Sequence, residues 1–188
     1  MGLKEDFIKE ASKIERKGIQ ELIGYLKTTD FFEAPSSTKY HGSEAYGLIE
    51  HSLAVYDIAH ELHNVFELDL SLESISICSL FHDVCKANFY AKEKRNKKTD
   101  GKWHEIEVWS IQDSFPLGHG EKSLFIIQKF IELTNDEALA IRWHLGGFDP
   151  GVHFGYPSGF SYHQAIQENK LLALIIIADL SAAYLLDK

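Results

Sequence analysis

Cysteine and long apolar runs are scarce in this sequence, and an excess of basic residues is missing. Only Cys78 and Cys85 are cysteines among 188 residues, too few for a disulfide framework or a four-thiolate zinc site. The longest apolar run, residues 171–178, is far too short to cross a bilayer. The first residues contain no apolar segment of the signal type. We therefore expect a protein of the reducing cytoplasm that does not associate with membranes.

The charge balance argues against a further class of protein. The formal net charge is -9, whereas nonspecific nucleic-acid binding requires a standing basic surface. We expect a small or locally steered substrate and no stable nonspecific binding of nucleic acid. A hydrophobic content of 45% at this length fits one soluble domain with a substantial core, and it leaves the oligomeric state open.

Apolar residues recur at helical spacing along most of the chain. The pattern predicts helices over residues 3–27, as one long or two short segments, and over 45–66, 72–86, 121–133 and 165–186, with a further helix ahead of His144. Residues 88–113 instead alternate around an Asp-Gly turn signal, which predicts a β-hairpin, the only strand candidate. Ser71 is a plausible N-cap, and Thr134 with Glu137 forms a capping-box pattern. The Gly/Pro-rich residues 148–161 are expected to form a loop.

Several ionisable side chains lie on or beside the apolar stripes of these helices. They are His51, the adjacent His82 and Asp83, His144, and Asp179. Such groups are costly to bury without partners. A single histidine on an apolar face is more often a hydrogen-bonded core residue, and an arginine or a helix N-terminus could hold Asp179. A divalent metal would satisfy all of them together, because imidazole nitrogen and carboxylate oxygen suit iron, manganese and zinc.

The order of these residues resembles the pattern of the HD-domain superfamily of metal-dependent phosphohydrolases. The segment GLIEHSLAVYDIA resembles the family's first-histidine helix, and SLFHDVCK resembles its LLHDIGK segment. The segments GHGEKS and AIRWHLGGFD supply two later histidines, His119 and His144. The resemblance covers about residues 36–185.

The resemblance implies an all-α fold, an HD-domain helical bundle with a small β-hairpin inserted at about residues 89–112. It also implies a single HD domain over residues 1–188. Within it, residues 1–35 would form an N-terminal helical extension, and residues 36–188 would form the metal-dependent catalytic core.

The six-ligand arrangement resembles the binuclear branch of this family, which includes HD-type exoribonucleases and cyclic-dinucleotide phosphodiesterases. By analogy, one ion would be held by His51, His82, Asp83 and Asp179, and Asp83 would bridge to a second ion held also by His119 and His144. The resemblance then implies hydrolysis of a phosphoester in a nucleotide, a phosphodiester or a short oligonucleotide, by a metal-activated hydroxide. Iron or manganese is favoured, and cobalt, nickel, zinc or magnesium could bind the same ligands.

Asp83 and Lys86 are the expected catalytic residues. Lys86 lies one helical turn after His82, from where it could bind the phosphate or steady the leaving group. A solvated lysine at a helix end is the competing interpretation. His41 and Arg142 are the further candidates for substrate binding. The basic residues 92–98 could cover an anionic ligand, although a solvated hairpin tip is slightly favoured.

Other functions fit the same residues. A mononuclear HD-type nucleotidase needs only four of the ligands, a di-iron oxygenase could use all six, and a nucleotide-binding module could have lost turnover. Dedicated nucleases of the binuclear branch usually carry an added oligonucleotide-binding domain, for which this chain has no room. The HD-GYP signature beyond HDVCK is also missing. We therefore expect neither polymeric RNA nor cyclic dinucleotides as substrates.

Overall fold

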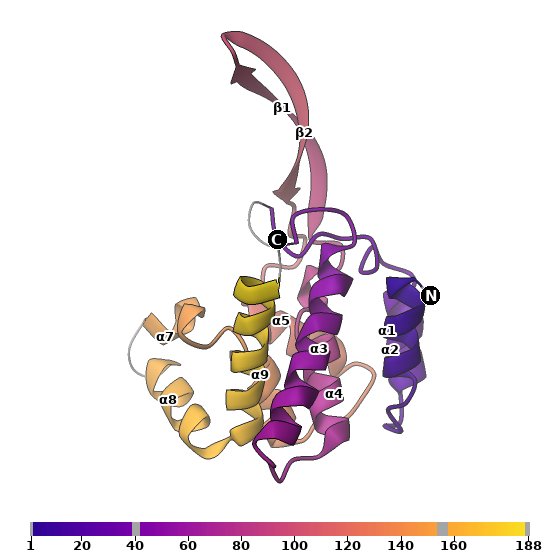
Figure 1. Cartoon of the computed structure of the whole chain (residues 1–188), viewed down its shortest axis with the longest axis vertical. Coiled ribbons are helices and arrows are strands. Elements are labelled where there is room, and N and C mark those ends of the chain that lie inside the picture. The colour runs from indigo at the N-terminus through magenta and orange to yellow at the C-terminus, as the bar shows by residue number, and fades with distance from the viewer. Residues whose placement is uncertain (1, 39–41, 154–157, 187–188) are drawn as a thin grey trace.

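The computed structural model describes residues 2–38, 42–153 and 158–186. Figure 1 shows a bundle of helices with a long β-hairpin projecting from one end. The α-helices are α1 (Leu3–Ala11), α2 (Ile19–Leu26), α3 (Gly47–Val65), α4 (Leu72–Phe81), α5 (His119–Ile127), α6 (Asn135–Trp143), α7 (Pro150–His153), α8 (Ser158–Glu168) and α9 (Lys170–Ser181). The hairpin consists of β1 (Tyr90–Thr99) and β2 (Lys102–Ile111). Short 3₁₀ turns form η1 (Val84–Lys86) and η2 (Gly146–Phe148), and a π-helical turn, η3 (Ala182–Leu186), extends α9. The predicted all-α fold with an inserted hairpin is confirmed.

The core is one cluster of buried apolar side chains to which the N-terminal helices contribute. In the centre of the bundle, α3 packs against α4 and α9, and α6 packs against α9. The ring of Phe7 on α1 lies edge-on to Phe31, Phe32 and Phe81, with ring centres 5.3 to 5.7 Å apart. Such edge-to-face contacts stabilise aromatic pairs beyond their buried area. The segment before α3 is therefore packed onto the same core as α4.

Local signals in the sequence set several element boundaries. The Ser71 hydroxyl accepts a hydrogen bond from the backbone N–H of Ser74, and Thr134 and Glu137 form the complete predicted capping box. The hairpin turns at Asp100 and Gly101, whose φ angles are +53° and +80°. Two successive positive φ values are the requirement of the type I′ turn that an Asp-Gly pair favours.

The C-terminal third differs from the prediction. The segment 165–186 is not one helix, because α8 and α9 meet at an angle of 103° around Asn169. The Asn169 side chain accepts from the N–H of Leu172 and donates to the carbonyl of Asp136, so it caps α9 and ties it to α6. The predicted loop 148–161 contains α7, which has Pro150 in its first turn, a position that proline tolerates.

Among the described residues, no single helix is both long and apolar enough to span a membrane. The pair α8 and α9 reaches that length and composition only together, across its sharp bend.

Candidate metal centre

The adjacent His82 and Asp83 lie where α4 ends, and both side chains are buried. The helix predicted to continue to Lys86 stops at Phe81, and the chain continues into the 3₁₀ turn η1. At Asp83 the backbone leaves helical geometry, with φ -107° and ψ 17°. The break brings the neighbouring imidazole and carboxylate to the same cluster, with His82 Nε2 3.5 Å from Asp83 Oδ2.

Two further elements bring ligand atoms to this pair. His51 comes from α3 and Asp179 from α9, and His51 Nε2 lies 3.0 Å from Asp179 Oδ1. His51 Nε2 also lies 3.3 Å from His82 Nε2 and 3.9 Å from Asp83 Oδ2. Side chains from three segments that are far apart in the sequence therefore converge: His51, the adjacent His82 and Asp83, and Asp179.

The other carboxylate oxygen of Asp83 faces a different pair of histidines. His119, the first residue of α5, lies with Nε2 2.7 Å from Asp83 Oδ1. His144, at the end of α6, has Nε2 3.6 Å from the same oxygen. The six predicted ligands thus form one contiguous cluster, with Asp83 between its two halves.

Backbone carbonyls orient two of these imidazoles. His82 Nδ1 lies 2.8 Å from the Ser79 carbonyl oxygen, and His144 Nδ1 lies 2.7 Å from the Ile141 carbonyl oxygen. A carbonyl only accepts, so each Nδ1 carries the proton and donates it, which turns the lone pair of Nε2 toward the cluster in the neutral ring. This is the arrangement found for histidines that bind metals.

The cluster fits a cation better than it fits a hydrogen-bonded core. His144 Nε2 is buried and has no hydrogen-bond partner among the described residues. A buried polar atom in that state costs about 1 to 3 kcal/mol. The surrounding donor set of imidazole nitrogens and carboxylate oxygens suits divalent first-row metals. The residues present therefore fit a divalent metal.

Electrostatics keep the carboxylates ready to bind. Burial opposes the ionisation of Asp83, but the Lys86 charge, with His82 and His119, holds its pKa well below the usual value. Burial likewise opposes the ionisation of Asp179, but the hydrogen bond with His51 and the charges of the nearby histidines together outweigh it, so its pKa is also lowered. Both groups are therefore anionic at neutral pH.

The two histidines beside Asp83 Oδ1 differ. Burial lowers the pKa of His119 despite the attraction of Asp83, which favours the neutral ring. Burial also disfavours the charged form of His144, but Asp83 and Asp179 raise its pKa above the usual value. A metal ion at His144 Nε2 would therefore compete with a proton.

Of the three predicted substrate-binding residues, Lys86 lies at this cluster. Its Nζ donates to Asp83 Oδ2 at 2.6 Å, and its side chain is mostly buried. Arg142 instead pairs with Asp149, at 2.7 Å, and with Glu121. His41 lies outside the described residues, so its role stays a prediction.

Cys85 is a member of this site that the sequence arguments did not include. Its Sγ lies 3.4 Å from His119 Nδ1, and it forms a possible ligand group with Asp83 and His119. Burial raises the pKa of this thiol to about 12. Its place two residues after Asp83 in HDVCK is the sequence signal that points to it.

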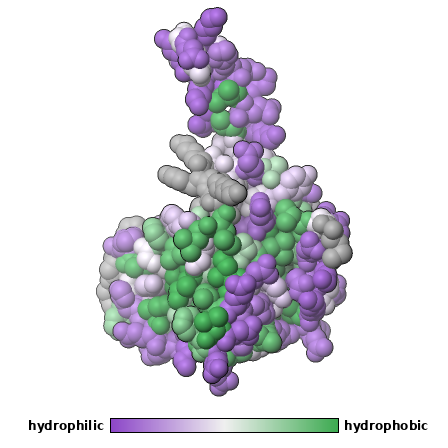
Figure 2. Space-filling model, in the orientation of Figure 1, coloured by the Kyte–Doolittle hydropathy of each residue, from purple (hydrophilic) through white to green (hydrophobic). Residues whose placement is uncertain are grey.

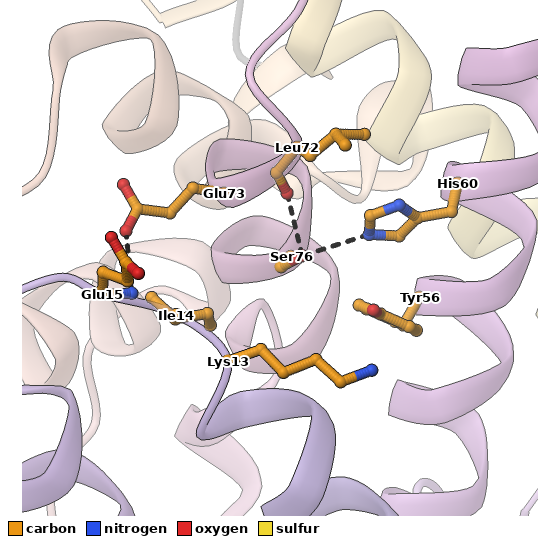
Figure 3. Close-up of a pocket in the computed structure, with 8 residues that line it drawn as sticks. All are labelled: Lys13, Ile14, Glu15, Tyr56, His60, Leu72, Glu73 and Ser76. Carbon is orange, nitrogen blue, oxygen red and sulfur yellow. Dashed lines mark hydrogen bonds between the residues drawn. The ribbon is translucent and has the colours of Figure 1, made fainter.

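A cavity of about 600 Å³ lies elsewhere, between the segment after α1 and the helices α3 and α4 (Figure 3). Its described lining residues include none of the six predicted ligands. Ser76 there donates to the Leu72 carbonyl and lies 3.1 Å from His60 Nε2. The Ser76 hydroxyl proton is thus directed at a backbone carbonyl. Activation of Ser76 as a nucleophile would require the proton to be directed at the imidazole.

Comparison with known proteins agrees with this geometry. The HD domain family matches residues 48–183. Ribonuclease Y of Mycoplasmoides gallisepticum (strain R(low / passage 15 / clone 2)) is 26% identical over 110 residues, which cover 56% of this chain and 18% of that protein. The match thus spans less than a fifth of the relative's length. No solved structure gives a significant match. The family match encloses all six predicted ligands, and the chain belongs to the HD domain family.

Proposed function

We propose that this protein hydrolyses a phosphoester in a small phosphorylated substrate, such as a nucleotide, a phosphodiester or a short oligonucleotide, with two divalent ions per chain. The observation that carries the proposal is the position of Asp83. Its Oδ2 faces His51 and His82, and its Oδ1 faces His119 and His144. A carboxylate with separate imidazoles at each oxygen is suited to bridge two ions.

When bound, a pair of divalent ions lowers the pKa of water and offsets the charge of phosphoryl oxygens. The chain supplies the rest of the chemistry. His82 and His144 are held by backbone carbonyls, so their ligand atoms need little reorganisation. The Lys86 ammonium lies beside the bridging carboxylate, where it can attract the anionic substrate and stabilise charge on the leaving oxygen. Iron and manganese are the favoured ions, because both accept imidazole nitrogen and carboxylate oxygen donors, and cobalt, nickel, zinc or magnesium could take their place.

The test is hydrolysis of p-nitrophenyl phosphate and bis-p-nitrophenyl phosphate by the full chain loaded with Mn²⁺ or Fe²⁺. We expect release of p-nitrophenol that stops on chelation and that Asp83→Asn abolishes while the far-UV spectrum is retained. Equal rates for Asp83→Asn and wild type would refute the proposal.

Two rivals predict other results. A di-iron oxygenase on the same ligands would consume oxygen with a polyol and release no phosphate. A mononuclear nucleotidase would act on the monoester with one ion and would tolerate His144→Ala. The second pair of imidazoles at Asp83 Oδ1, from His119 and His144, favours the binuclear form.

A further inference from the structure

The β-hairpin is the part of the fold that core packing does not explain. Its strands contact each other over their whole length, and neither makes extensive contact with another described element. Figure 1 shows it standing away from the bundle, at the end where α3 begins and α9 ends. An isolated two-stranded hairpin is at best marginally stable in water. An arm of ten-residue strands on which no other described element packs extensively therefore calls for a binding role.

One face of the hairpin combines aromatic rings with lysines. Side chains alternate between faces along a strand, and the register pairs Lys92 with Trp109 and Lys98 with Trp103. These four residues consequently share one face. Trp103 is 68% exposed at the tip, and Lys92 Nζ lies 5.4 Å from the ring centre of Trp109. The two indoles are six residues apart on β2, which corresponds to about 20 Å.

The tip carries cations that no carboxylate neutralises. Nearer the base, Lys92 pairs with Glu107 at 3.6 Å and Lys94 with Glu105 at 2.7 Å. Lys97, Lys98 and Lys102 form no ion pair with any residue in the described part of the chain. Figure 2 shows the hairpin as mostly hydrophilic, with a small apolar segment. A net cationic arm on a protein of charge -9 is suited to an anionic partner more than to an apolar one.

The same face leads back to the metal centre. Tyr90 lies on it at the base and donates to the Ser36 carbonyl at 3.1 Å. Burial raises the pKa of this phenol to about 12, and the nearby Lys86 charge opposes the shift. Lys86 in turn contacts Asp83. The base of this face therefore lies near Lys86, which is itself beside the candidate ligands.

A cavity lies against this face near its base. It has a volume of about 330 Å³ and is lined by Lys92, Glu107, Val108 and Trp109 of the hairpin and by Thr38, Ser43 and Glu44 of the segment before α3. Small-molecule sites have volumes of roughly 300 to 1,000 Å³. The cavity therefore has room for a small ring system stacked beside Trp109.

We propose that this hairpin face binds a single-stranded oligonucleotide and leads it to the metal centre, an inference that rests on the phosphohydrolase function proposed above. Bases would stack on Trp109 and Trp103, and phosphates would contact Lys92 and Lys98. Stacking on aromatic rings accepts any base, and it requires bases that are not already stacked in a duplex. Glu105 and Glu107 share the face and offset part of its positive charge. Stacking therefore contributes more to the affinity than charge does, and a longer polyanion would bind little more tightly than a short one.

Binding is tested on the full chain with a fluorescent single strand of about 10 nucleotides, a length within the range of known single-strand sites. A chelator in the assay prevents hydrolysis of the strand during the binding measurement. Trp103→Ala and Trp109→Ala should each weaken binding at least about 5-fold, the lower bound for loss of one stacked base. Lys98→Gln should weaken it more than Lys97→Gln, the matched control, because Lys97 lies on the opposite face. Equal affinity of wild type, Trp103→Ala and Trp109→Ala would overturn the inference.

Turnover separates this inference from the proposed function. With Mn²⁺, Lys97→Gln on the opposite face should keep wild-type rates on bis-p-nitrophenyl phosphate and on the oligonucleotide, whereas the tryptophan variants should lose rate on the oligonucleotide. If wild type and variants cut the oligonucleotide equally, the hairpin inference fails and the phosphohydrolase function stands. If no ester is cut but the variants still lose binding, the proposed function fails and the binding face stands. If Trp103→Ala changes only the sedimenting mass, the face is an interface between copies of this chain, and the hairpin inference fails.

Discussion

Asp83 is the residue on which the site depends. Its position after a buried helix could be predicted, because an ionisable pair behind an apolar run needs a compensating partner. The division of its two oxygens between two pairs of histidines could not, since it depends on where the chain breaks after α4. The carbonyls of Ser79 and Ile141 that orient the imidazoles were likewise hidden, because backbone groups leave no residue-type signal.

At the same scale, Lys86→Met tests the role of the ammonium beside Asp83. We expect turnover of phosphoesters to fall about 100-fold, the usual cost of removing one group that stabilises transition-state charge. Metal content, measured by elemental analysis, should stay at the wild-type level because Lys86 is not a ligand. Lys129→Met, a change of the same type at a lysine placed over the ring of Phe125, is the control and should be silent. Full activity of Lys86→Met would assign this lysine to structure alone.

At the scale of elements, the sequence predicted what local chemistry decides. Caps at Ser71 and Thr134 and the turn at Asp100 depend on a few neighbouring residues, and all three form as expected. The break at Asn169 was missed because its cap also depends on a distant carbonyl, that of Asp136 in α6. Apolar periodicity alone runs through that position without interruption.

An ion-pair network ties the segment after α1 to α4 and α6. Arg16 donates to the buried carboxylate of Glu137 at 2.9 and 3.1 Å and to Glu73 at 3.0 Å. Burial opposes the ionisation of Glu137, but Arg16, together with hydrogen bonds from Thr134 and Ser74, outweighs burial and lowers the pKa of Glu137. The ionised form of Glu137 therefore stabilises the fold at pH values above 4.5, the usual pKa of a glutamate. This contribution is lost as the pH falls through the lowered pKa.

Arg16→Met should therefore reduce the free energy of unfolding by about 3 to 5 kcal/mol at pH 7, because a buried carboxylate loses its partner. The deficit relative to wild type should shrink as the pH falls, because burial without Arg16 favours the protonated carboxyl of Glu137 in the variant. Urea denaturation at several pH values measures both effects, with Lys17→Met as the exposed control. A deficit independent of pH would exclude this ion pair as its cause.

Two glycines, one just before α2 and one within it, predict opposite effects of a change to alanine on stability. Gly18 has φ +92°, and an added Cβ would lie 1.9 Å from the Phe130 carbonyl oxygen. Gly24 lies in the helix with open space around it. We expect Gly18→Ala to destabilise by more than about 2 kcal/mol and Gly24→Ala to stabilise by about 0.5 to 1 kcal/mol. Thermal unfolding of both variants checks this, and a stable Gly18→Ala would contradict the close approach to Phe130.

At the scale of the whole molecule, five helices or helix ends bring together the six predicted ligands, which are spread over residues 51 to 179. No local pattern encodes such convergence. The order of the residues and the family resemblance therefore predict the ligand set, whereas apolar periodicity does not. The surface is also divided. Figure 2 shows hydrophobic residues gathered over the bundle, whereas most of the hairpin is hydrophilic. Ile177 on α9 and Leu185 in η3 are among the exposed hydrophobic residues.

The most direct test of the account is the number of metal ions per chain, measured by elemental analysis after loading with Mn²⁺ or Fe²⁺ and desalting. We predict two ions for wild type, one for His144→Ala, and close to none for Asp83→Ala, with helical content retained in each. Wild-type protein that retains no metal under these conditions would contradict the convergence of these ligands on a cation.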